Sequence, residues 1–294
     1  MSRALLLALM CAFFVAVQSS QTYMLGVPGR YQMDDRNGYC GETSIQTLMV
    51  AYGVWIPQEV ARKAGSNDPY KDLLPGEDYN KALRKLGIKF DEFTGNGHKE
   101  FFAWAKKYLV KRIGVVEVAY IKGGAFSEYD HVMPMVGIKT SSKTGYSPDD
   151  VVYVHTNYDD DPIPRRVGDY WCARSNKKDS WTKAGCVPKN TQWGHAIKGP
   201  VYLGIGPRVE LEVPTRAEPG IGKSVTFRGR VRIRGLTPGK TYKLFIIHSL
   251  GDIPKSKSST LHGISPKKTF NATTTKKTLR VRFASGKPAY FICV

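Results

Sequence analysis

The sequence predicts an α+β protein, in which a helix-plus-antiparallel-sheet domain is followed by a small all-β sandwich domain. Apolar residues recur at helical spacing after Cys40, which is typical of a helix packed against a core. Two mostly apolar stretches, 131–138 and 151–155, have the length and composition of strands. From about residue 205, short alternating strands punctuated by Pro and Gly replace the helical patterns. At 294 residues and 41% hydrophobic content, the chain is large enough for two globular domains.

Three segments are expected along the chain. They are a signal peptide at 1–20, the helix-and-sheet domain at 21–206 and a basic β-sandwich module at 207–294. The boundary between the last two lies in "VYLGIGPRVELEVPTRAEPG", where the pattern changes from helices to alternating strands.

The first twenty residues have the order of a secretory signal peptide. Arg3 precedes a run of 14 apolar residues, and the small polar residues Ser19 and Ser20 follow it. An uncleaved membrane anchor is the alternative, but this run is short for a span. We therefore expect the mature protein to be secreted, or held in the lumen of the secretory or lysosome-like pathway.

In an oxidising compartment the remaining cysteines can form disulfides. Cys172 and Cys186 bracket a polar loop, and a bridge closing a loop of this size would contribute about 3 kcal/mol to stability. Cys40 and Cys293 are left, and they fall in different predicted domains. No Cys or His pair has zinc-finger spacing nearby, and we expect neither a metal nor a cofactor. Asn271 begins the one glycosylation sequon.

Cys40 lies at the start of the first predicted helix. The apolar residues on one face of this helix are Ile45, Leu48, Met49 and Tyr52. Gly53 is a natural stop for it. A cysteine at a helix N-terminus lies where the helix dipole favours a thiolate, so it is a candidate nucleophile. The alternative is a small apolar residue packed in the core, which is common for cysteine.

A catalytic thiol needs a base, which is usually histidine. The mature chain contains His98, His131, His155, His195, His248 and His262. His131 differs from the others because it opens the apolar strand "HVMPMVGI" after a turn-like stretch. The next strand, "VVYVH", is followed by Asn157, which would lie beside His131 if the two strands pair in antiparallel fashion.

This order of residues resembles the papain-like cysteine peptidases. Gln32 is followed by a Cys-Gly helix start, then by a histidine opening a strand, then by Asn157 after the next strand. The blocks "CGETSIQTLMVAYGVWIPQEVARKAG" and "HVMPMVGI" are most similar to the branch that contains the double-glycine leader peptidases. The resemblance covers about residues 30–160, extends at most to 204 and leaves out the basic module.

The resemblance implies a role for each matching position. Cys40 would be the nucleophile and His131 the general base and acid. Gln32 and the Cys40 backbone amide would donate to the oxyanion, and Asn157 would orient the imidazole.

Two departures from that branch affect this assignment. An Asp-Pro pair usually follows the third strand, whereas here Asn157 precedes "YDDDP", so Asp159 or Asp161 could orient the histidine instead. Glu42 also stands near the cysteine where proline is common, and its charge would oppose a thiolate.

The positive charge is concentrated in the C-terminal part. Residues 205–294 contain 18 Lys and Arg against 4 acids, a net charge of +14 out of +19 for the whole chain. On two predicted strands, arginines alternate with apolar residues: Arg228, Arg230, Arg232 and Arg234 on one, Arg280 and Arg282 on the other. We expect Val225, Phe227, Val231, Ile233, Leu279, Val281 and Phe283 to face the core.

Such an arginine face is suited to a polyanion, although charged strand faces are often only solvated. Candidate partners are an anionic polysaccharide, an acidic cell wall or an anionic membrane. Nucleic acid is less favoured because the strand faces lack stacking aromatics. The stretch "LTPGKTYKL" faintly resembles fibronectin type III modules but is too short to indicate a function.

Taken together, the sequence predicts a secreted cysteine peptidase that hydrolyses peptide or protein substrates through a thioester intermediate. Its cationic module would bind an anionic surface or polymer. One alternative is a catalytically inactive papain-fold protein that acts as a binder or effector through the basic module. The other is an acyl-transfer or amidase relative with the same site.

Overall fold

The computed structural model describes residues 19–33, 38–66, 77–123, 127–173, 185–202, 204, 206–214, 224–253, 261 and 263–294. The signal peptide predicted at 1–20 lies outside these residues except for its last two positions. Within the described residues, no helix is both long enough and apolar enough to cross a bilayer.

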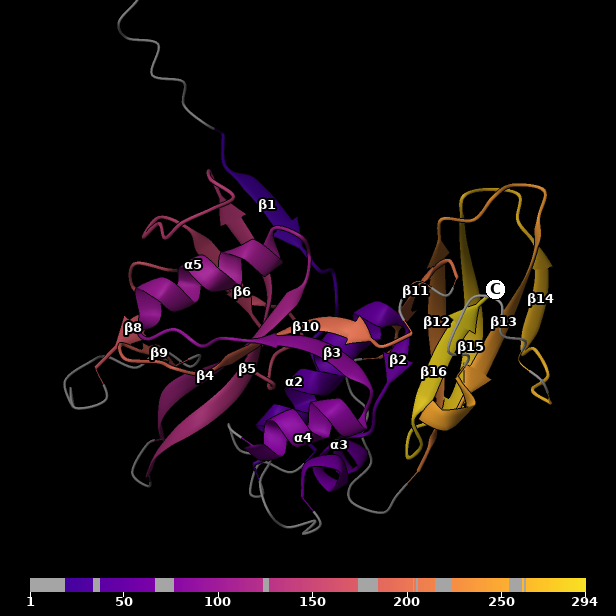
Figure 1. The fold of residues 1–294 in the computed structure, drawn as a ribbon, viewed down its shortest axis with the longest axis horizontal. Helices are drawn as coiled ribbons and strands as arrows, with labels where there is room; N and C mark the ends of the chain where they lie inside the picture. The colour runs from indigo at the N-terminus through magenta and orange to yellow at the C-terminus, as the bar shows by residue number, and fades with distance from the viewer. Residues whose placement is uncertain are drawn as a thin grey trace, which may run out of the picture.

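The N-terminal part is built on a seven-stranded antiparallel sheet (Figure 1). Its strands are β1 (Gln21–Met24), β3 (Ile88–Glu92), β4 (Gly114–Gly123), β5 (Ser127–Thr140), β6 (Val151–Val154), β7 (Ile163–Arg166) and β10 (Gly194–Pro200). The order is β3-β10-β4-β5-β6-β7, and β1 also pairs with β5. The chain is therefore an α+β protein with antiparallel sheets, as the sequence predicts.

Helices cover both faces of this sheet. They are α2 (Cys40–Met49), η2 (Val50–Tyr52), α3 (Gln58–Gly65), α4 (Glu77–Lys85) and α5 (His98–Leu109). In Figure 1, α5 lies on the opposite side of the strands from α2, α3 and α4. On β5, Val132 and Val136 belong to the core beneath α2, whereas Met133 and Met135 belong to the core beneath α5. This two-sided burial explains why the strand is apolar on both faces.

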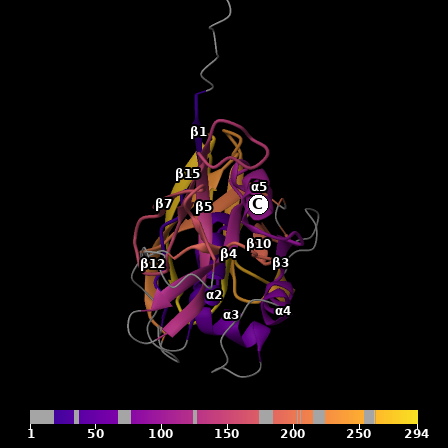
Figure 2. The ribbon, with the colours of Figure 1, turned by 90° about the vertical axis from the view of Figure 1, so that its left-hand side faces the viewer.

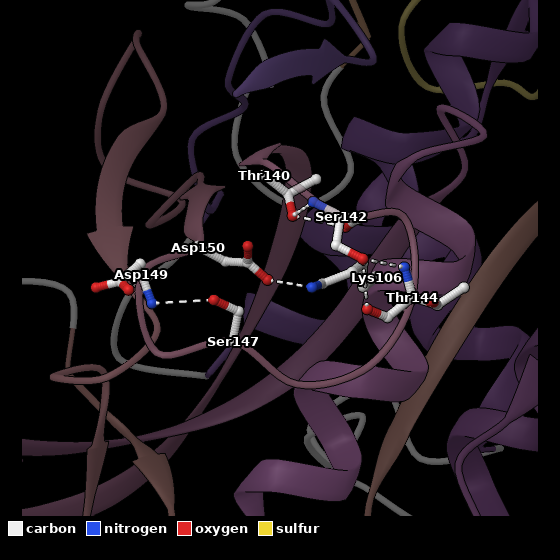
Figure 3. Close-up of polar contacts among 7 residues, drawn as sticks. All are labelled: Lys106, Thr140, Ser142, Thr144, Ser147, Asp149 and Asp150. Atoms are coloured by element: carbon white, nitrogen blue, oxygen red, sulfur yellow. Dashed lines mark hydrogen bonds and ion pairs between the residues drawn. The ribbon is translucent and has the colours of Figure 1, made fainter. Parts of the chain in front are cut away.

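A buried ion pair joins α5 to the start of β6 (Figure 3). Lys106 Nζ lies 2.5 Å from Asp150 Oδ2, and both side chains are almost fully buried. The turn that leads from β5 to β6 has its own hydrogen bond, in which Thr140 Oγ1 donates to the Ser142 carbonyl over 2.7 Å. Breaking one half of such a pair leaves a buried charge, so the contact fixes where α5 sits on the sheet.

The C-terminal part is a sandwich of two small antiparallel sheets. Its strands are β11 (Arg208–Glu212), β12 (Thr226–Arg234), β13 (Thr241–Ile247), β14 (Lys268–Asn271), β15 (Lys276–Ala284) and β16 (Ala289–Cys293), with η3 (Leu250–Asp252) between β13 and β14. One sheet has the order β11-β12-β15, and the other is β14-β13-β16-β2. Burial alternates along β12, as its sequence predicts. Val225 was expected to face the core, but it precedes β12 and is 47% exposed.

The second sheet contains a strand from the N-terminal part. This strand, β2 (Val54–Trp55), begins two residues after η2 and pairs with β16. Figure 1 shows β2 beside the sandwich, and Figure 2 shows the molecule turned by 90°. The two parts therefore share one sheet and one continuous core, whereas the sequence suggested separate cores.

Trp55 is the main contact between the two parts. Its side chain is fully buried, and its ring centroid lies 5.0 Å from that of Phe227 and 5.7 Å from that of Phe283. Its Nε1 donates to the Ser285 carbonyl over 2.8 Å. The Arg30 guanidinium lies over the Trp55 ring, 4.9 Å from its centroid. The indole thus fills the interior of the sandwich while its backbone continues from η2.

Gly53 permits the sharp passage from η2 to β2. It has a φ of 69°, and a Cβ there would lie 2.6 Å from Val209 Cγ1. Gly26 has a similar φ of 71° but open space around the same position, so it is a matched control. We expect Gly26→Ala to lower the free energy of unfolding by about 1 kcal/mol through backbone strain alone. Gly53→Ala should lower the free energy of unfolding by clearly more than Gly26→Ala does, because the added methyl group also displaces β11.

Chemical denaturation of both variants measures this difference. Equal losses at the two positions would show that the contact between η2 and β11 adds nothing to the requirement for glycine at residue 53.

Candidate functional site

Cys40 is the first residue of α2, and all ten residues of this helix are buried. The Cys40 side chain keeps 9% exposure, so it lies at the margin of the core. The preceding Tyr39 makes no side-chain cap, and the first-turn amide of Thr43 is bonded back to the Tyr39 carbonyl over 2.9 Å. Cys40 therefore lies at the positive end of the helix dipole, a position that favours the thiolate form.

His131 lies on β5, opposite Ala119 of β4. It was expected to open the strand, but β5 begins at Ser127, because the β4–β5 hairpin continues pairing as far as Gly123. The imidazole is 1% exposed. Its Nε2 lies 2.8 Å from the Thr156 carbonyl oxygen.

This hydrogen bond sets the tautomer of His131. A carbonyl can only accept, so Nε2 carries the proton and Nδ1 keeps its lone pair. Burial lowers the pKa of His131 to about 4, and the bond to the Thr156 carbonyl opposes this only in part. At neutral pH the imidazole is therefore uncharged and able to accept a proton at Nδ1.

Asn157 links the helix start to the histidine strand. Its amide nitrogen lies 3.2 Å from the Cys40 carbonyl oxygen and 2.9 Å from the Val132 carbonyl oxygen. The residue has a φ of 69°, a left-handed conformation that Asn adopts more readily than most residues. The Asn157 amide thus joins the start of α2 to Val132, the residue that follows His131 on β5.

The orienting contact at His131 differs in detail from the expected one. Nε2 donates to the backbone carbonyl of Thr156, while the Asn157 amide holds the carbonyls of Cys40 and Val132. Asp159, the first alternative, accepts from Thr156 Oγ1 over 2.6 Å and so fixes the turn that presents this carbonyl. Asp161, the second, is exposed; burial lowers the pKa of His155, and the charge of Asp161 opposes this shift only in part.

Gln32 joins the same cluster. Its backbone N–H donates to the Asn157 carbonyl over 3.1 Å, and its Nε2 donates to the Tyr158 hydroxyl over 2.9 Å. The Tyr158 ring in turn stacks on His131, with 5.6 Å between centroids and an interplanar angle of 10°. Nε2 has a second proton besides the one used on Tyr158. Tyr158 is a member of this site that sequence reasoning missed, because nothing in the local pattern marks it.

The charge of Glu42 is balanced inside the core. Its Oε1 lies 2.6 Å from Nε of Arg62, and both side chains are almost fully buried. The Arg62 guanidinium also stacks on the Tyr39 ring at 3.5 Å and donates to the Gly38 carbonyl over 3.1 Å. Because a buried cation accompanies the carboxylate, Glu42 opposes ionisation of Cys40 less than its position in sequence suggested.

The predicted disulfide is confirmed. Cys172 and Cys186 are bonded, with 5.7 Å between their Cα atoms. Cys40 and Cys293, whose pairing the sequence left open, form no disulfide in the described part of the chain, and both are buried. Burial raises the pKa of the Cys293 thiol to about 12, so this residue is a poor nucleophile and a useful internal control. The sequon residue Asn271 lies exposed at the end of β14.

The six predicted polyanion-binding arginines lie on the outer face of β12 and β15, all exposed. No acid is interleaved with the arginines on these two strands. The third strand of the sheet, β11, however, places Glu210 and Glu212 beside β12. Arg232 lies 2.7 Å from Glu212, and Arg234 lies 3.1 Å from Glu210. Part of the face is therefore neutralised.

Comparison with protein-family models gives no match, and comparison with curated protein sequences gives none either. Among the described residues, no group of three or more His, Cys, Asp or Glu is arranged to hold a metal ion.

The buried histidines make stability depend on pH. His131 and His195 both have their pKa lowered by burial from 6.5 to about 4. Between these values the unfolded chain binds protons that the folded chain excludes, so stability rises with pH from about 4 to 6.5 and is lost on acidification. Each histidine contributes a slope of up to about 1.4 kcal/mol per pH unit.

We expect His131→Gln to lower this slope near pH 5 by close to one histidine's share, because Gln can keep a donor to the Thr156 carbonyl without titrating. Urea denaturation at several pH values measures the slope. An unchanged slope would contradict burial of a neutral His131.

Asn157 should contribute to stability through its amide rather than its backbone. Asn157→Gly keeps the positive φ but removes the donor to two buried carbonyls, and we expect a loss of about 1–2 kcal/mol. The matched control is Arg112→Gly, because Arg112 also has a positive φ, 58°, but is exposed. That change should be neutral or slightly stabilising, and equal effects in thermal unfolding would refute the bridging role.

Proposed function

We propose that the protein is a secreted, papain-like cysteine peptidase in which Cys40 is the nucleophile and His131 the general base and acid. The observation that carries this proposal is the tautomer of His131. With Nε2 donating to the Thr156 carbonyl, the neutral ring has its acceptor lone pair on Nδ1, and the Asn157 amide joins the next residue of the same strand to Cys40 at the start of α2. The disulfide supports secretion, because such bonds persist in oxidising compartments.

In the proposed mechanism, the Cys40 thiol transfers its proton to His131 Nδ1, and the thiolate attacks the substrate carbonyl carbon. The Cys40 backbone amide and the second Nε2 proton of Gln32 donate to the resulting oxyanion. His131 then protonates the leaving amine, which departs and leaves a thioester on Cys40. Water gives a proton to His131 and attacks this thioester, and the proton returns to the thiol as the acid product leaves.

Asn157 and Asp159 act as positioning residues in this scheme. Asn157 holds the Cys40 carbonyl against that of Val132, so the helix start cannot drift from the histidine strand. Asp159 fixes the Thr156 hydroxyl, and with it the turn whose carbonyl binds His131. In this scheme the Asn157 amide and the Asp159 carboxylate together take the place of a single side chain that orients His131.

The same thioester would also serve an acyl-transfer enzyme or amidase, in which an amine takes the place of water or the scissile amide is not peptidic. A catalytically inactive binder would use the fold without the thiol chemistry. Reactivity of the thiol separates the enzyme proposals from the inactive one.

We expect a thiol-directed epoxide to label Cys40 and spare Cys293 in the folded, non-reduced protein. The burial-raised pKa of Cys293 makes it the built-in control. Labelling should fall by at least about tenfold in His131→Ala and in His131→Gln, because neither side chain can take up the thiol proton. Peptide mapping by mass spectrometry identifies the labelled residue, and circular dichroism verifies that both variants are folded.

Failure of folded wild-type protein to react would overturn the catalytic proposal and leave the binder. Undiminished labelling in a folded His131 variant would remove His131 from its proposed role.

For the C-terminal module, we propose binding to an anionic polymer or surface. The support is the exposed arginine face of β12 and β15 together with the net charge of +14 in residues 205–294.

A further inference from the structure

The arginine face of the sandwich is divided into two chemically different halves. Cross-strand pairing across β11, β12 and β15 arranges its residues in rows. In two successive rows the β11 member is an acid: Glu210 opposite Arg232, and Glu212 opposite Arg230. The register of β11 ends at Glu212, so it places no residue opposite Arg228. One end of the face therefore carries ion pairs, and the other is open on that side.

The open end contains two pairs of directly facing arginines. Arg228 is opposite Arg282, and Arg230 is opposite Arg280. Facing residues on antiparallel strands lie about 5 Å apart, and alternate residues along a strand about 6.7 Å apart, so four guanidinium groups form a compact array. Like charges in this arrangement repel each other, a cost that a bound anion would offset.

Ion pairing does not relieve this repulsion. Within the described residues, Arg228, Arg280 and Arg282 form no ion pair. Arg230 has only a 3.8 Å contact with Glu212, whose carboxylate is 2.7 Å from a different arginine. The cations of the open end are therefore available to a ligand.

A hollow of about 600 Å³ coincides with this end of the face. Its cationic lining residues are Arg228, Arg230, Lys267, Lys268, Arg280 and Arg282. Lys268 begins β14 and Lys267 directly precedes it; β14 belongs to the opposite sheet, so both sheets contribute charge to one site. The lining contains no aromatic side chain, and hence no surface on which a nucleic-acid base could stack.

We propose that this hollow is a specific site for a linear sulfated polysaccharide, and that the ion-paired half of the arginine face is not part of it. A guanidinium group can donate two parallel hydrogen bonds to two oxygens of the same oxyanion. An array of closely spaced guanidinium groups therefore suits a chain with closely spaced sulfate groups. The inference rests on the proposed anion binding of the C-terminal module. It is independent of the chemistry proposed at Cys40.

Two double variants test the site in the intact protein. Arg280→Gln/Arg282→Gln removes two charges from the hollow. Arg232→Gln/Arg234→Gln removes two charges from the ion-paired half of the same sheet, so the loss of net charge is identical. Point substitutions are needed because deletion of residues 207–294 would remove the strand that pairs with β2.

With heparin as the probe, we expect the first variant to bind about tenfold or more weakly at moderate salt. The slope of log K against log salt should decrease by about one for each lost contact. The ion-paired control should stay close to wild type in both quantities.

Each outcome decides a different point. If wild-type protein does not bind heparin, the anion-binding proposal and this site fall together. If both variants weaken equally, the module binds anions but the hollow is not the site. If single-stranded DNA of equal charge competes as well as dextran sulfate, the polysaccharide assignment is wrong. Epoxide labelling of Cys40 should be unchanged in both variants, which separates this test from that of the catalytic proposal.

Discussion

The buried indole of Trp55 joins the two halves of the protein. It packs against Phe227 and Phe283 inside the sandwich, while its own strand continues directly from the helix that begins at Cys40. Truncating a buried tryptophan typically costs about 3–5 kcal/mol, a large share of the stability of a domain. Because β2 pairs with β16, the last strand of the sandwich also fixes the end of the helical segment. The C-terminal module is thus part of the scaffold that holds the candidate site.

The burial of α2 also constrains the charges and polar groups of this helix. Since every residue of α2 is buried, its polar groups need internal partners. Arg62 of α3 pairs with Glu42, and Arg30 reaches both Gln46 of the helix and the Pro214 carbonyl beyond β11. Each arginine therefore balances a buried polar group while linking segments that are distant in sequence. Cys40 thus begins a helix whose one carboxylate, that of Glu42, has a buried cation beside it.

Local patterns allowed the elements to be predicted, whereas pairings between distant segments could not be. The helix at Cys40 and its stop at Gly53 follow from apolar spacing and glycine chemistry, and the inward face of β12 follows from strict alternation. The joining of Val54 and Trp55 to β16 leaves no such signal, since two residues are too few to show a period and their partners lie more than 230 positions away. The sequence likewise suggested that the charge of Glu42 would oppose a thiolate at Cys40. Its partner Arg62 lies on another helix, so local patterns could not reveal the ion pair.

Within the candidate site, too, the sequence predicts less than the structure shows. The order of glutamine, cysteine, histidine and asparagine indicates which residues meet, but hydrogen bonds decide what each one does. Sequence alone could not show that His131 donates to a backbone carbonyl or that Tyr158 stacks on its ring.

Successive residues of β12 face opposite sides of the sheet, so a residue in the core is followed directly by one that lines the basic hollow. Phe227 packs on Trp55, and Arg228 points from the opposite face into the basic hollow. A polyanion bound there would be held by a strand whose inner face contacts Trp55, the residue of β2 that joins the two parts. Binding would therefore set the orientation of the candidate site relative to the polyanion, because the two parts share one core.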